Sequence, residues 1–105
     1  MTKAEEKRIM RAAIDTYGAK AQTLMMFEEM SELQKALCKF PRARNNMEKA
    51  IFVASIQEEI ADVEIMLEQM KLIYDLDGLA EERVENTREH KLERLRERLN
   101  IREGR

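Results

Sequence analysis

Residues 27–33 read FEEMSEL and place three carboxylates in a segment whose other positions are typical of the inside of a helix. A second segment, EEIADVE at residues 58–64, has a similar pattern further along the chain. The acids that share the pattern are Glu28, Glu29 and Glu32 in the first segment and Glu58, Glu59 and Asp62 in the second. One acidic cluster on a helix is ordinary, but two with matching spacing need an explanation.

The spacing places the acids in pairs on helix faces. Glu29 and Glu32 are three positions apart, so on a helix their Cβ atoms lie about 5–6 Å from each other, and Glu59 and Asp62 repeat that spacing. If the two helices form an antiparallel hairpin about residues 45–46, residues that are equally far from the turn lie opposite each other on the two helices. A symmetric turn would then bring all four carboxylates into one patch. The sequence does not establish that symmetry.

Such a patch needs compensation, because two unit charges about 4 Å apart repel by about 4 kcal/mol at an effective dielectric near 20. The acids are tolerated if some are protonated, if they point into water or if they bind cations. Carboxylates without His or Cys partners favour hard cations such as Mg²⁺ and Mn²⁺. A di-iron bundle site needs Glu-x-x-His on two helices. The only histidine is His90, and the residue three positions before it is Thr87 and not Glu, so that class is disfavoured.

Composition indicates a single all-α domain covering residues 1–105. Hydrophobic residues make up 44% of the chain and charged residues 38%, which suits helices with one apolar and one charged side. Only 3 Gly and 1 Pro disfavour a fold of strands and tight turns. A core this small leaves apolar stripes uncovered, so we expect a dimer or a larger assembly.

Charge and targeting signals exclude several classes. The net charge of −2 gives no basic signature for nucleic-acid binding. The first ten residues lack the apolar core of a signal peptide, and the longest apolar run, AIFVA, is far too short to span a membrane. Cys38 is the only cysteine, which favours a reducing compartment and the role of a small buried hydrophobe. We expect a soluble cytoplasmic protein.

Hydrophobic periodicity predicts four helices, with caps that the sequence suggests locally. Thr2 followed by Glu5 resembles a capping box, and Pro41 is expected to end the second helix by disfavouring helical geometry at Phe40. Asn45 or Asn46 can cap the third helix, and Asp75 or Asp77 the fourth. The predicted ranges are about 2–16, 19–39, 47–74 and 79–101.

These segments resemble a known family. GAKAQTLMMFEEMSEL followed by EEIADVEIML is similar to the MazG-type all-α nucleoside triphosphate pyrophosphohydrolases, over roughly residues 17–71. The shared motif is Glu-x-x-Glu followed by Glu-x-x-Asp. The resemblance implies a four-helix domain with a central antiparallel hairpin, assembled as a homodimer or homotetramer. It also implies Mg²⁺, or alternatively Mn²⁺, bound by Glu29, Glu32, Glu59 and Asp62.

The implied reaction is hydrolysis of a nucleoside triphosphate to the monophosphate and pyrophosphate. Glu28 or Glu58 is expected to complete a coordination shell or to orient the attacking water, and the identity of the general base stays open. Lys91 and Arg94, three positions apart, are the best matches to residues that approach the phosphates, although each also fits a solvated helix. Gln22 is the candidate for substrate recognition, and no set of residues that reads the base is evident.

Two alternatives remain open. The first is a non-enzymatic helical oligomer, an interaction or regulatory protein whose hairpin is a coiled coil with acidic rims. The second keeps the fold and binds nucleotide or metal without turnover. For the acids themselves, the ordinary alternative is a pair of solvated helix faces.

Overall fold

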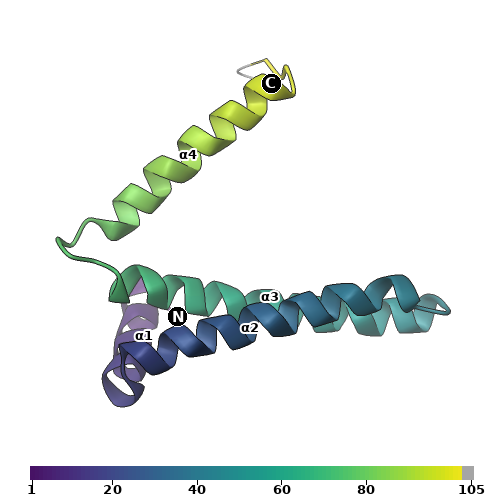
Figure 1. Ribbon diagram of the computed structural model, residues 1–105, viewed down its shortest axis with the longest axis horizontal. Helices are drawn as coiled ribbons and strands as arrows, with labels where there is room; N and C mark the ends of the chain where they lie inside the picture. The colour runs from purple at the N-terminus through teal and green to yellow at the C-terminus, as the bar shows by residue number, and fades with distance from the viewer. Residues whose placement is uncertain (103–105) are drawn as a thin grey trace. The chain divides into compact units, whose positions relative to one another are not determined.

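The computed structural model describes residues 1–102 and contains no strand in that range, which confirms the all-α prediction. Four α-helices and one short 3₁₀ helix make up the described chain (Figure 1). The helices are α1 (Lys3–Tyr17), α2 (Ala19–Lys39), η1 (Phe40–Arg42), α3 (Asn46–Ile73) and α4 (Ala80–Arg98). The chain divides into two compact units, Met1–Ile73 and a second unit that starts at Tyr74, and each is described by itself.

The beginning and end of α1 follow from local chemistry. The Thr2 hydroxyl accepts a hydrogen bond from the backbone N–H of Glu5, and the Glu5 carboxylate accepts one from the backbone N–H of Thr2, both at 3.1 Å. This is the predicted capping box. At the other end Gly18 has φ +92°, a conformation that residues with a Cβ rarely adopt, and its N–H donates to the Ile14 carbonyl. Gly18 therefore separates α1 from α2.

The end of α2 corrects one expectation. The α-helix stops at Lys39, as predicted, but Phe40 keeps helical geometry with φ −54° and ψ −44°. The reason is that Pro41 lies in the first turn of η1, where its missing N–H would have no intrahelical partner in any case. The extended geometry before proline was a tendency, and the 3₁₀ turn overrides it.

The start of α3 is capped by Asn45. Its side-chain oxygen accepts from the backbone N–H of Glu48 at 2.9 Å, and the Glu48 carboxylate in turn accepts from the backbone N–H of Arg44 at 2.9 Å. The Arg44 guanidinium also lies 2.8 Å from the same carboxylate. These contacts join the connection between α2 and α3 to the first turn of α3.

Helices α2 and α3 pack side by side and run in opposite directions, while α1 lies at the end of the pair where α2 begins and α3 ends (Figure 1). The buried side chains lie along the contact between α2 and α3. They are Gln22, Met26 and Ala36 on α2 and Met66 and Gln69 on α3. We call this line of contact the seam.

The apolar core of the first unit is thin. No large side chain of residues 1–73 is fully buried, and several apolar residues of α2 and α3 are exposed. Examples are Leu24 (54% exposed), Phe27 (60%), Leu37 (51%) and Ile51 (58%). Cys38 is also exposed, so its predicted role as a buried hydrophobe is wrong, because it does not lie on the side of α2 that meets α3. Much apolar surface of α2 and α3 is thus uncovered in the single chain.

The second unit is held by local contacts. Asp75 accepts hydrogen bonds from the backbone N–H groups of Gly78 and Ala80, and Asp77 accepts from that of Leu79. The N-cap position itself is Leu79, so the two predicted aspartates bond to the turn before α4 and to its first residue without occupying the cap.

Within α4 no residue is buried, and two ion pairs join residues at i,i+3 spacing. They are Glu85 with Arg88 and Glu93 with Arg96. Such pairs are each worth a few tenths of a kcal/mol, roughly 0.3–0.5. Among the described residues, no helix combines the length and apolarity that crossing a membrane requires.

Candidate metal centre

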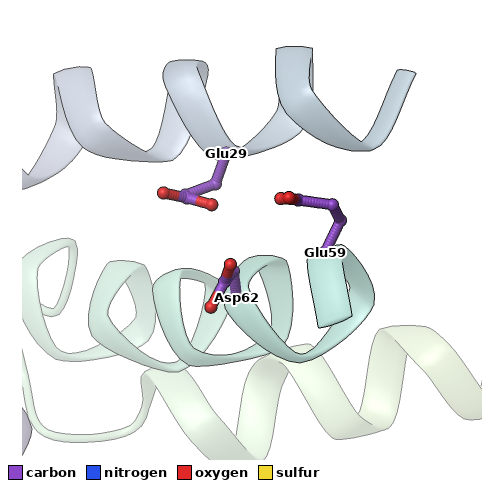
Figure 2. Close-up of side chains that lie close together, drawn as sticks. All are labelled: Glu29, Glu59 and Asp62. Atoms are coloured by element: carbon purple, nitrogen blue, oxygen red, sulfur yellow. The ribbon is translucent and has the colours of Figure 1, made fainter. Parts of the chain in front are cut away.

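Three carboxylates from two helices meet at the seam. Glu29 of α2 lies opposite Glu59 and Asp62 of α3, and their side chains point toward one another (Figure 2). One carboxylate oxygen from each lies within 4.8 Å of the other two. All three residues are partly buried. The structure therefore brings together three of the four acids that the sequence suggests as metal ligands.

The acids lie there because they occupy seam positions. Glu29 follows Gln22 by seven residues, and Asp62 precedes Gln69 by seven, which on a helix is two turns along the same face. Gln22 and Gln69 are buried and joined by a 2.6 Å hydrogen bond from Nε2 of Gln22 to Oε1 of Gln69. The same faces that meet at the glutamines therefore meet again at the carboxylates.

This crowding raises the pKa of Glu29. The largest cause is its loss of solvent contact, followed by the negative charges of Asp62 and Glu59. A hydrogen bond between Glu29 and Asp62 raises the pKa further, because it favours a proton on Glu29. The metal-free seam thus opposes full ionisation of its acids.

The pKa of Glu59 is raised as well. Loss of solvent contact is again the first cause, and the charges of Asp62, Glu32 and Glu58 add to it. A bound cation would reverse both effects, since it stabilises the ionised form of every carboxylate around it.

Glu59 also has an unpaired atom. Its Oε2 is buried and has no hydrogen-bond partner in the described part of the chain. Buried polar atoms nearly always have a partner, and one without a partner costs stability. A cation between Glu29, Glu59 and Asp62 would supply that partner.

The donor set fits a hard divalent cation. Every ligand atom in the cluster is a carboxylate oxygen, which suits Mg²⁺ or Mn²⁺. Oxygen atoms around Mg²⁺ lie about 2.1 Å from the ion, so neighbouring ligand oxygens are separated by about 3–4 Å. The three oxygens lie within 4.8 Å of one another, so a bound ion would draw them slightly closer together.

The fourth predicted ligand, Glu32, is not part of this cluster. Its side chain is exposed and forms an ion pair with Lys35 at 3.4 Å. It still lies near enough for its charge to raise the pKa of Glu59. Glu28 and Glu58, the candidates for orienting water, are exposed beside the cluster and act on it through their charges.

Of the predicted substrate-binding residues, Gln22 belongs to the first unit and Lys91 and Arg94 to the second. Gln22 is only 6% exposed and uses its amide to hold Gln69, two turns from Glu29 along α2. Lys91 and Arg94 are exposed on α4, in the second unit. The structure therefore does not bring Gln22 into the carboxylate cluster.

Sequence reasoning missed Gln69. A signal for it was present, because Gln69 lies as far after residues 45–46 as Gln22 lies before them. The relation holds for amides as it does for acids, but an amide in an apolar stretch has no obvious chemical role that would single it out.

Comparison of the chain with protein-family models, with curated proteins and with solved structures gives no match.

Proposed function

We propose that this protein is a metal-dependent nucleoside triphosphate pyrophosphohydrolase with a MazG-like arrangement of α2 and α3. The observation that carries the proposal is the meeting of Glu29, Glu59 and Asp62 within 4.8 Å across the seam. Glu59 Oε2, buried without a partner, supports a cation at this position. Glu32 would join the ligand set by leaving Lys35, an exposed pair whose loss costs little.

The chain's own residues would divide the work as follows. Glu29, Glu59 and Asp62 hold Mg²⁺ or Mn²⁺, and exposed Glu28 and Glu58 are the carboxylates available to orient a water molecule. When bound, the metal neutralises the triphosphate and polarises the attacked phosphoryl group. Hydrolysis consumes one water, breaks the bond between the α- and β-phosphoryl groups and yields the monophosphate and pyrophosphate.

The proposal includes a homodimer or homotetramer. Leu24, Phe27 and Ile51 are each more than half exposed, although they lie on long helices that already bury one side. Burial of apolar surface stabilises by about 25 cal/mol per Å², so association of these faces would be favourable. A second copy would cover apolar surface that the thin core of one chain leaves in water.

The same exposed side chains favour a second candidate, a non-enzymatic helical oligomer that acts as an interaction or regulatory protein. This candidate needs the helix faces but not the metal. It predicts little effect of Mg²⁺ on melting, whereas a specific site adds RT ln(1 + [L]/Kd), about 2.7 kcal/mol at a metal concentration of 100 Kd.

The test is pyrophosphate release from a panel of canonical and modified nucleoside triphosphates, with Mg²⁺ and with a chelator. We expect release that requires the metal for at least one member of the panel. Mn²⁺ binding without release from any nucleotide would leave a binding protein. No release and no effect of Mg²⁺ or Mn²⁺ on melting would overturn the proposal and favour the non-enzymatic oligomer.

A further inference from the structure

We infer that the buried Gln22–Gln69 pair sets the register of α2 against α3 and so acts as a positioning pair for the carboxylate cluster. The positioning role rests on the proposed function, while the register role does not. Neither glutamine touches the cluster, so each would act through the alignment of the two helices.

The first observation is the burial of this amide pair. Gln22 and Gln69 are 6% and 5% exposed, as low as Met26 and Met66 in the apolar core. Glutamine carries both donors and acceptors, and in the described residues the two side chains meet at 2.6 Å across a sequence separation of 47 residues. A contact between partners so far apart in sequence reports the alignment of α2 and α3 and not local helix geometry.

The second observation is the spacing to the acids. Each glutamine lies one heptad from a carboxylate on its own helix, Gln22 from Glu29 and Gln69 from Asp62. Seven residues span about 10.5 Å of helix, so the amide pair and the Glu29–Asp62 pair are successive layers of one seam. An alignment that joins the amides therefore also joins the carboxylates.

The amides can set this alignment because each needs a hydrogen-bond partner when it is buried. Methionine side chains are flexible and fill a seam in several arrangements, so Met26 and Met66 specify the alignment weakly. Sliding α3 along α2 by one turn, about 5.4 Å, would leave both buried amides without a partner, which is unfavourable. A polar pair at a seam position is known to specify register in coiled coils, at some cost in stability.

Without the amide pair, the carboxylates would favour an alignment of α2 and α3 in which they lie apart. When they are ionised, Glu29, Glu59 and Asp62 carry like charges that repel one another, which favours alignments that separate them. The amide pair holds the acids level despite that repulsion. The cluster is therefore preorganised before a cation arrives.

The experiment replaces both amides with unbranched apolar side chains of similar length, Gln22→Met together with Gln69→Met. A matched control is Gln34→Met with Gln57→Met. These two glutamines lie on the same helices, are exposed, and are as far from the turn as each other. Removing both partners of a buried hydrogen bond is close to neutral for folding, so we expect a folded protein by circular dichroism. The pair Gln22→Leu with Gln69→Leu carries the test if the methionine variant does not fold.

Two measurements are made on each protein. The first is Mn²⁺ affinity, which we expect to fall by about 10- to 100-fold in the seam variant and to stay unchanged in the control. The second is the distance distribution between spin labels on Cys38 and on a cysteine introduced by Glu64→Cys, both exposed sites, without added metal. We expect one narrow distance in the control and a broadened or shifted distribution in the seam variant, by about 5 Å or more.

The outcomes separate the two claims. An unchanged distance in the seam variant would overturn the register role, and unchanged Mn²⁺ affinity would overturn the positioning role. If the unmodified protein does not bind Mn²⁺, the proposed metal centre fails and the positioning role with it, while the distance measurement still decides whether the amide pair sets the register.

Discussion

The acids of the seam and the acids of the second unit have the same chemistry in opposite settings. At the seam, Glu29 and Glu59 face other carboxylates, and their pKa values are raised. In the second unit, Asp77 accepts hydrogen bonds from Arg83 and from the backbone of Leu79, and its pKa is lowered. Asp77 thus has local partners in Arg83 and the backbone of Leu79, while Glu59 Oε2 has none in the described part of the chain.

This difference separates structural acids from candidate functional acids. An acid paired with an arginine a few residues away, such as Glu85 with Arg88, is explained by helix stability. An acid placed in a seam against two others destabilises the metal-free fold. Since such an arrangement has a cost, it is the better candidate for a site that binds something.

The largest expected effect is on activity at the seam. Glu59→Gln keeps the shape of the side chain but removes the charge and one ligand oxygen, so we expect metal-dependent pyrophosphate release to fall at least about 100-fold, while the melting temperature without metal holds or rises. The control is Glu64→Gln, an exposed glutamate on the same helix, which should leave release unchanged. A large loss of folding with unchanged activity would contradict the assignment of the site.

The next effect concerns packing in the two units. Met66 is 5% exposed at the seam, and Met66→Ala should lower the free energy of unfolding by about 2–5 kcal/mol, measured by urea titration. Leu92 on α4 is 48% exposed, and Leu92→Ala should change it by no more than about 0.5 kcal/mol. An equally large loss for Leu92→Ala would show that α4 buries this side chain against a partner. Local contacts alone would then not account for the stability of α4.

The smallest effect is the pH dependence of stability without metal, because all these acids contact solvent and are screened. Raised pKa values at Glu29 and Glu59 mean that the folded state binds more protons than the unfolded state, so their contribution is present below the ordinary glutamate pKa and is lost as pH rises through the raised values. The lowered pKa of Asp77 acts in the opposite direction, and its contribution is lost as pH falls through the lowered value.

Urea titrations over a pH series with a chelator test this contrast. Glu59→Gln should flatten the decline of stability with rising pH, and Asp77→Asn should flatten the decline with falling pH. Saturating Mg²⁺ should remove the first decline, since the cation favours the ionised carboxylates. If Glu59→Gln leaves the pH profile unchanged, the raised pKa of Glu59 does not contribute to the decline of stability with rising pH.

Much of the fold is readable from short segments. The range of α2 follows from the periodicity between Gly18 and Pro41, and the capping box of Thr2 and Glu5 places the start of α1. Asn45 does the same for α3. These features depend on hydrogen bonds and backbone preferences within four or five residues, so the amino-acid sequence contains them directly.

The candidate site was readable only in part. The spacing suggested Glu29, Glu32, Glu59 and Asp62 as ligands; the structure brings Glu29, Glu59 and Asp62 together, while Glu32 pairs with Lys35 outside the cluster. The i,i+3 spacing places Glu29 and Glu32 on one face of α2. A helical face is broad, however, and of these two only Glu29 lies on the seam.

What the sequence by itself determined about this protein is therefore the set of four helices, the caps of α1 and α3 and the two acidic motifs, because each is decided by neighbours along the chain. The tertiary structure alone decided that Gln22 meets Gln69, that Glu59 Oε2 is buried without a partner and that Cys38 is exposed. These depend on the rotation and alignment of α2 against α3. Packing of distant residues sets both, and no local pattern encodes them.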